Sequence, residues 1–90
     1  MIEKSYKITS INGIHARSAA VLVKEASKFS ADITLCLNNV CVDFKSIMGV
    51  MSLGIYKNEI VKIICVGSDE VEAIKHLDNV IHELNIGKEY

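Results

Sequence analysis

DITLCLNNVCVDF, the stretch from Asp32 to Phe44, decides the fold of this chain. Apolar and polar residues alternate on both sides of the central Asn38-Asn39, which is the pattern of a β-hairpin closed by a two-residue turn. Folding the stretch about this turn pairs its apolar side chains on one face, as Leu37 with Val40, Leu35 with Val42, and Ile33 with Phe44. The other face carries Thr34, Cys36, Cys41 and Asp43. The stretch therefore predicts a sheet with one buried face and one face open to solvent.

The residues before the hairpin predict a strand and a helix. Ser5 to Thr9 form a short strand-like run, and the Asn12-Gly13 pair that follows it is a turn signal. From Ala16 to about Ser27, small apolar residues recur at helical spacing, so we expect an amphipathic helix that lies close on the sheet. The residues of this small-residue face are Ala16, Ala19, Ala20, Val23 and Ala26.

The residues after the hairpin predict a second helix, a strand and a third helix. Ser46 is a favourable N-cap for a short helix from Ile47 to about Leu53, and the β-branched run from Ile60 to Val66 predicts a strand. Asp69 and Glu72 have the spacing of a capping box at the start of the last helix. The apolar stripe of that helix comprises Val71, Ile74, Leu77, Val80, Ile81 and Leu84.

These elements follow one another in the order βαββαβα. We expect an α+β fold, an open-faced sandwich in which three helices cover one face of a four-stranded, mainly antiparallel sheet. Gly87 is expected to end the last helix. Because the chain has 90 residues, half of them hydrophobic, residues 1–90 are expected to form a single domain.

The composition argues against several classes of protein. No apolar stretch reaches the length of about 18 residues that a membrane span needs, and the first residues lack the pattern of a signal peptide. We therefore expect a cytoplasmic protein with no membrane insertion. A net charge of −1 gives no case for direct nucleic-acid binding. His76 and His82 lie away from any cysteine pair at ligand spacing, so no metal site is expected.

Cys36 and Cys41 face each other in the predicted hairpin. If they form a non-hydrogen-bonded pair, their Cα atoms would be about 4.5 Å apart, which is close enough for a disulfide. A reducing cytosol favours free thiols. We hypothesise that mild oxidation bridges the pair, and an unchanged thiol count after oxidant treatment would disprove this.

The segment Gly13-Ile14-His15-Ala16-Arg17 lies where a loop enters the first helix. The first turn of a helix has backbone N–H groups without intrahelical partners, and the helix dipole places partial positive charge there. A phosphate is stabilised at such a point, whereas a protonated histidine is disfavoured, which leaves His15 a neutral nucleophile. Arg17 can bring a guanidinium to a phosphoryl oxygen. Spacing alone leaves a second interpretation open, in which His15 is a capping or surface histidine and Arg17 a solvated charge.

Several segments resemble one protein family. Residues 13–19, GIHARSA, resemble the active-site signature of HPr, the histidine-containing phosphocarrier of the phosphoenolpyruvate-dependent sugar phosphotransferase system, which typically reads Gly-(Ile/Leu)-His-Ala-Arg-Pro-Ala. Residues 26–29 (ASKF), 45–54 (KSIMGVMSLG) and 67–70 (GSDE) also resemble family segments, in the family's order and spacing. The family's fold has the order βαββαβα.

The resemblance implies roles for individual residues. His15 would accept a phosphoryl group from enzyme I and pass it to enzyme IIA domains, and Arg17 would stabilise that group. Ser46 would be phosphorylated by HPr kinase/phosphorylase, with a catabolite-control transcription regulator as a further partner. The chain would be a monomeric carrier without a cofactor, and not a free-standing enzyme. A regulatory paralogue that acts mainly through Ser46 is the alternative.

The sequence departs from the family signature at Ser18, where the family has proline. Serine is compatible with a helix start, and the substitution puts the rigidity of the junction between loop and helix in question. The expected partner-binding residues are Ser18, Lys24, Ile47, Met48 and Met51. A methionine suits a surface that must fit several partners, because its side chain is adaptable.

Overall fold

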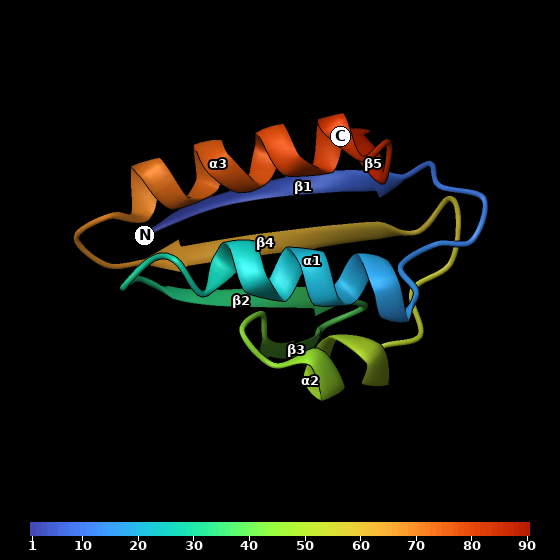
Figure 1. The fold of residues 1–90 in the computed structure, drawn as a ribbon, viewed down its shortest axis with the longest axis horizontal. Helices are drawn as coiled ribbons and strands as arrows, with labels where there is room; N and C mark the ends of the chain where they lie inside the picture. Colours follow the sequence, from blue (N-terminus) through green and yellow to red (C-terminus); the bar gives the residue numbers. More distant parts are fainter.

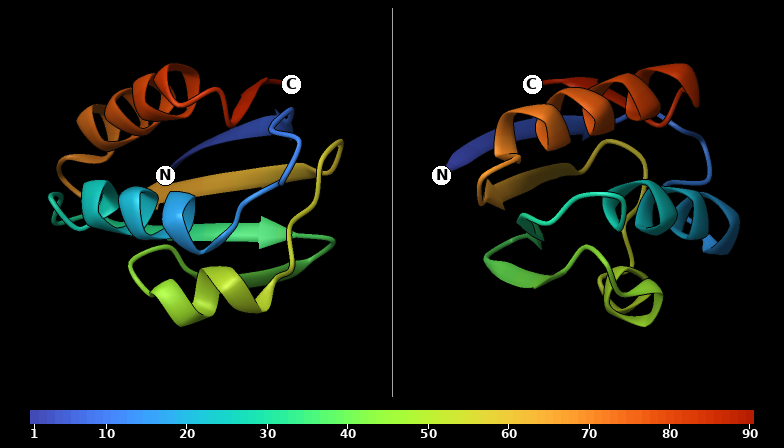
Figure 2. Two further views of the ribbon diagram at one scale, coloured as in Figure 1. Left: turned by 45° about the vertical axis from the view of Figure 1, so that its right-hand side comes forward. Right: turned by 60° about the vertical axis from the view of Figure 1, so that its left-hand side comes forward.

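The computed structural model describes residues 1–90 and contains five strands and three helices (Figure 1). In chain order these are β1 (Ile2–Ile8), α1 (Ala16–Ala26), β2 (Asp32–Leu37), β3 (Val40–Asp43), α2 (Ile47–Ser52), β4 (Ile60–Val66), α3 (Glu70–Glu83) and β5 (Gly87–Glu89). The strands form one sheet in the order β3-β2-β4-β1-β5, and every neighbouring pair is antiparallel. The helices lie on one side of this sheet (Figure 2), so the α+β open-faced sandwich is confirmed.

The prediction of four strands was wrong by one, because β5 adds a fifth beside β1. Its three residues, Gly87 to Glu89, are too few to show an alternating pattern, and β5 is held by main-chain pairing with β1. Gly87 therefore does not end the last helix. Asn85, with φ of +53°, makes the turn after α3, and a Cβ at Gly87 would lie 2.7 Å from the Lys7 carbonyl oxygen.

The predicted hairpin register is confirmed. Leu37 pairs with Val40, Leu35 with Val42 and Cys36 with Cys41. Asn38 and Asn39 both have positive φ, +51° and +69°, as a type I′ turn requires. Val40 is nevertheless exposed, because β3 is an edge strand.

Cys36 and Cys41 are joined by a disulfide, with their Cα atoms 4.1 Å apart. This differs from the expectation of free thiols, which rested on the redox state of the cytosol and not on the chain. The hairpin register itself brings the two thiols together. Cys65 is free and fully buried.

The helices bury faces slightly different from those predicted. In α1 the buried residues are Ala19, Leu22, Val23 and Ala26, whereas Ala16 and Ala20 are exposed. Val71, in the first turn of α3, and Leu84, the residue that follows this helix, are exposed, so the two ends of the predicted stripe are not buried. No helix has both the length and the apolar character that a membrane span requires.

Asp69 does not cap α3 with its side chain, so the predicted capping box is absent. Its carboxylate instead accepts hydrogen bonds from the backbone N–H groups of Ser30 and Ala31, both at 2.8 Å. These bonds tie the start of α3 to the loop that follows α1. Glu70 takes up the local role, because its Oε1 accepts a hydrogen bond from the Gly67 N–H at 3.0 Å.

Candidate functional site

The loop that leads into α1 is fixed at Gly13. This residue is buried and has φ of +62°, and a Cβ placed on it would lie 2.1 Å from the carbonyl oxygen of Ile55. The same oxygen accepts a hydrogen bond from the Ile14 N–H at 3.1 Å. Glycine is therefore required here, because the loop lies directly against the segment that follows α2.

A second contact holds the beginning of the same loop. The backbone N–H groups of Thr9 and Ser10 both donate to the carbonyl oxygen of Ile86, at 2.9 and 3.1 Å. Ile86 is buried and lies between α3 and β5. The loop is thus positioned by segments from the middle and from the end of the chain.

His15 is the N-cap of α1. Its backbone is extended, with φ of −109° and ψ of −178°, and its carbonyl oxygen accepts the first helical hydrogen bond from Ala19 at 2.8 Å. The Ser18 hydroxyl accepts a hydrogen bond from the His15 N–H at 3.0 Å and donates one to the His15 carbonyl oxygen at 3.1 Å. A proline at position 18 could form neither bond. Ser18 therefore links the loop to the helix through hydrogen bonds that the proline of the family signature cannot make.

The first turn of α1 is suited to an anion. The backbone N–H groups of Ala16 and Arg17 have no hydrogen-bond partner within the chain, and the turn contains no acidic residue. The free N–H groups and the helix dipole both favour negative charge at this point.

His15 and Arg17 line the same open depression, which has a volume of about 210 Å³. Both side chains are exposed. The other lining residues are Ser10, Ser18, Val21, Leu84 and Ile86. The two residues that the sequence singled out are therefore brought to one solvent-accessible place. Val21 and Leu84 were missed, because the sequence places Leu84 in the buried stripe of its helix and gives Val21 no distinguishing feature.

Lys24 extends this surface along α1. Arg17, Val21 and Lys24 are spaced four and three residues apart and are all exposed, so they form one stripe on the outer side of the helix. The stripe carries two positive charges and leads away from the depression.

Ser46 is the N-cap of α2, as the sequence predicted. Its Oγ accepts a hydrogen bond from the Gly49 N–H at 3.0 Å. Within the helix Val50 faces the core, whereas Ile47, Met48 and Met51 are 47%, 83% and 40% exposed. The helix lies beside α1 (Figure 2), and the segment that follows it contacts the loop before His15. Exposed apolar side chains are thus present on the element next to the candidate site.

The two histidines of α3 are separate from this site. His76 Nε2 lies 2.6 Å from the Glu25 carboxylate and so links α3 to α1, and His82 is exposed near the end of α3.

Comparison with known proteins identifies the family. A family model described as "PTS HPr component phosphorylation site" matches residues 2–83. The chain is similar to the histidine-containing phosphocarrier protein of Mycoplasma, with a TM-score of 0.93 and 37% identity over 96% of this chain and 98% of that one. It is similar to HPr from Thermoanaerobacter tengcongensis, with a TM-score of 0.88 and 46% identity over 92% and 93%.

A third similar structure is Crh, a catabolite repression protein of Bacillus subtilis. Its TM-score is 0.73 and its identity 36%, over 92% of this chain and 95% of that one, and Crh is a swapped dimer in that structure. The family match spans nearly all of the chain, and the similar structures share its fold. The chain therefore belongs to the HPr family of phosphocarrier proteins.

Proposed function

We propose that this protein carries phosphoryl groups on His15, receiving them from phosphorylated enzyme I and passing them to sugar-specific enzyme IIA domains. The observation that carries the proposal is that the His15 and Arg17 side chains line one open depression at the start of α1. A partner docked over this depression can bring its own histidine to the His15 ring, because no element of the chain covers it.

The chemistry follows from that arrangement. A ring nitrogen of His15 attacks the phosphorus of the donor's phosphohistidine, and one nitrogen–phosphorus bond forms as the other breaks. The free N–H groups of the first turn and the Arg17 guanidinium stabilise the phosphoryl oxygens. Because the bond formed and the bond broken are of the same kind, the exchange is near-isoergic and needs no cofactor.

We further propose that Ser46 is a regulatory site, phosphorylated by HPr kinase/phosphorylase. The Ser46 Oγ lies at the positive end of α2, so a phosphate there is compatible with the helix. It would place negative charge beside Ile47, Met48 and Met51, on a surface that has to receive an anionic partner site. A catabolite-control transcription regulator would be the reader of this modification.

In this proposal the protein is a single-domain, monomeric and cytoplasmic carrier. Ser18, Lys24, Ile47, Met48 and Met51 form the docking surface beside His15. The exposure of Lys24 and of the three apolar side chains of α2 supports this assignment. Sedimentation of the purified protein across a range of concentrations tests the monomer.

A labelling experiment tests the carrier function. We expect incubation with radiolabelled phosphoenolpyruvate and enzyme I to place an acid-labile label on the chain. His15→Ala should abolish the label, whereas His82→Ala, which removes an exposed histidine from α3, should leave it unchanged. Arg17→Ala should slow labelling without changing the folded state, as followed by circular dichroism. Equal labelling of the wild type and His15→Ala would refute the proposal.

The similarity to Crh favours one alternative, a regulatory paralogue that acts mainly through Ser46. Under this alternative the wild type acquires no label from phosphoenolpyruvate and enzyme I. ATP with HPr kinase/phosphorylase labels the wild type instead, and Ser46→Ala abolishes that label.

A further inference from the structure

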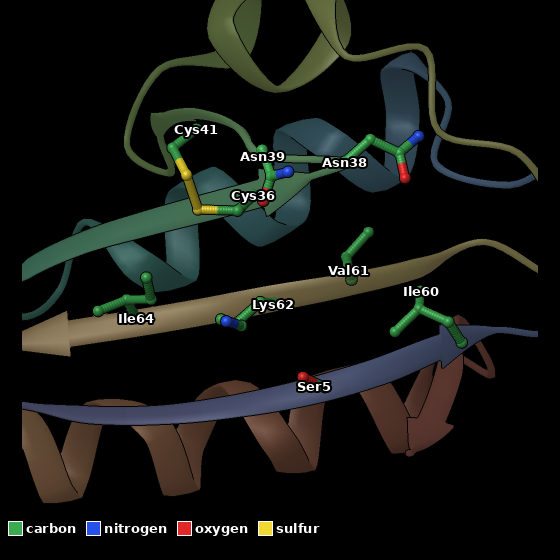
Figure 3. A pocket seen from close by; sticks show the side chains of 9 residues that line it. All are labelled: Ser5, Cys36, Asn38, Asn39, Cys41, Ile60, Val61, Lys62 and Ile64. Carbon is green, nitrogen blue, oxygen red and sulfur yellow. A yellow bond between two sulfur atoms is a disulfide. The ribbon is translucent and has the colours of Figure 1, made fainter.

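Four side chains form a row across the open face of the sheet, the face that no helix covers. Cys41 on β3 is the register partner of Cys36 on β2, Cys36 is the partner of Lys62 on β4, and Lys62 is the partner of Ser5 on β1. Register partners point to the same face. All four line an open depression of about 260 Å³ (Figure 3). Cys41 is exposed, whereas Cys36 is buried with 8% of its surface accessible, and neither belongs to the hydrophobic core cluster on the helix-covered face.

The backbone holds the two cysteines together independently of the sulfur–sulfur bond. The type I′ turn at Asn38-Asn39 sets the register, and the pairing of Leu35 with Val42 on the other face of the hairpin supports it. The Cα atoms of Cys36 and Cys41 are 4.1 Å apart. The register therefore keeps the two cysteines opposite each other when the bond is open.

Lys62 gives the pair a cationic neighbour. Lys62 is the register partner of Cys36 and its side chain points to the same face, and positive charge beside a cysteine favours the reactive thiolate. Glu3 lies 3.7 Å from the Lys62 Nζ and offsets part of this charge. Asp43 is an acidic residue on the same face, two residues along β3 from Cys41, and it pairs with Thr34 and not with either cysteine. Its carboxylate accepts a hydrogen bond from the Lys45 N–H.

The remaining cysteine is in the opposite situation. Cys65 faces the core from β4 and is fully buried. Burial raises the pKa of its thiol, which disfavours the thiolate. Of the three cysteines, only the Cys36–Cys41 pair is therefore placed for thiol–disulfide exchange.

We propose that Cys36 and Cys41 are a reversible dithiol–disulfide site that exchanges with low-molecular-weight disulfides, and that its closed form fixes the edge strand β3. In closure the exposed Cys41 thiolate attacks the small disulfide, forms a mixed disulfide and releases one small thiolate. Cys36 then attacks the Cys41 sulfur and releases the second. The two protein thiols lose two protons and two electrons, and the small disulfide becomes two thiols.

The location of the pair gives closure a structural effect. β3 pairs only with β2, and its residues are exposed or half-buried, so little apolar contact holds it. Two residues after Cys41, Asp43 accepts hydrogen bonds from the N–H groups of Lys45, through its carboxylate, and Ser46, through its carbonyl. A cross-link at Cys41 thus restrains the strand that supports the start of α2. The depression beside the cysteine pair shares no lining residue with the one at His15.

A redox titration tests the exchange. The reduced protein is equilibrated with mixtures of reduced and oxidised glutathione, quenched with acid, and analysed by intact mass and by alkylation of free thiols. We expect a form that is lighter by two hydrogen atoms and has one free thiol in place of three. Dithiothreitol should convert this form back to the reduced protein. The bridged peptide should contain Cys36 and Cys41. Persistence of all thiols, or of glutathione adducts without bridging, would overturn the proposal.

Two further measurements test the roles of Lys62 and of closure. At one fixed pH, Lys62→Met should slow bridging several-fold, whereas Lys75→Met, on an exposed position of α3, should not. Equal rates in the two variants would exclude the charge effect. Hydrogen exchange at the β3 amides should be several-fold faster in the reduced protein than in the oxidised one, with Cys36→Ser/Cys41→Ser insensitive to redox state. Identical exchange in both forms would refute the structural part of the proposal.

Discussion

The Ser18 hydroxyl bonds both backbone groups of His15, accepting from its N–H at 3.0 Å and donating to its carbonyl oxygen at 3.1 Å. The residue that departs from the family signature is therefore the one that holds the first turn of α1 onto the loop before it. The rigidity that proline would provide through its ring is provided here through a side-chain contact.

Ser18→Ala should weaken the start of α1. It removes both hydrogen bonds to His15, and losses of this kind at a helix N-terminus cost about 1 kcal/mol. We expect the free energy of unfolding in urea to fall by roughly that amount, and phosphoryl transfer to slow. Ser18→Thr keeps the hydroxyl and serves as the control. If the alanine and threonine variants are equally stable, the hydroxyl has no structural role.

Gly13→Ala should be much more damaging than Gly54→Ala. Both glycines have positive φ, +62° and +60°, so alanine at either position costs about 1–2 kcal/mol in backbone strain. A Cβ at Gly54 has no neighbour within 4 Å, whereas one at Gly13 would clash with Ile55 and Tyr56. We expect urea denaturation to show a clearly larger loss for Gly13→Ala. Equal losses would mean that the loop can move away from Ile55.

Tyr6→Phe should reduce the stability of the protein at neutral pH, and the reduction should be smaller at low pH. The buried Tyr6 hydroxyl donates to Asp78 Oδ1 at 2.7 Å. Burial alone would raise the pKa of Asp78, but this bond and the nearby Lys4 ammonium hold it below its usual value. A carboxyl group whose pKa is lowered by folding stabilises the folded state at any pH above its pKa in the unfolded chain, which is about 4 for aspartate. This stabilisation is lost as the pH falls through the pKa of the folded state.

We therefore expect Tyr6→Phe to lose about 1.5 kcal/mol at pH 7, and the gap to the wild type to narrow below about pH 4. Carboxyl chemical shifts should show a higher pKa for Asp78 in the variant. Tyr56→Phe, at an exposed position, should match the wild type at every pH.

Asp69→Asn should destabilise the protein, whereas Glu72→Gln should not. Hydrogen bonds from the Ser30 and Ala31 N–H groups lower the pKa of Asp69, while Glu72 is exposed and has no side-chain hydrogen bond in the fold. Because folding lowers the pKa of Asp69, its contribution to the free energy of unfolding is present at pH values above its pKa in the unfolded chain. This contribution disappears as the pH falls through the pKa of the folded state. Thermal unfolding at pH 7 and at low pH measures both effects. If the two variants lose equal stability, Glu72 contributes as much as Asp69, and the capping box that the sequence predicts would be present after all.

The parts of the fold that the sequence could predict depend on neighbours in the chain. The register of Cys36 and Cys41 follows from the alternation around Asn38-Asn39, and the N-cap role of Ser46 depends on the residues just after it. The strand β5 could not be predicted, because its partner β1 lies at the other end of the chain.

The same distinction applies to the candidate site. His15 and Arg17 are neighbours on one helix, so their proximity was predictable. That Leu84 lines the same depression depends on how α3 ends above the first loop, which no local pattern records. The predicted capping box at Asp69 was wrong for the same reason. The N–H groups that donate to its carboxylate belong to a loop that is distant in sequence, so no local pattern indicates them.

The hydrogen bonds to the Ile55 and Ile86 carbonyl oxygens have a consequence for biosynthesis. The segment before His15 has both of its contacts only after Ile86 has been synthesised and docked. A nascent or truncated polypeptide that stops short of Ile86 lacks one of these anchors. If His15 carries a phosphoryl group as proposed, a chain that lacks Ile86 should carry it less well, because the loop before His15 is then held at only one of its two contacts.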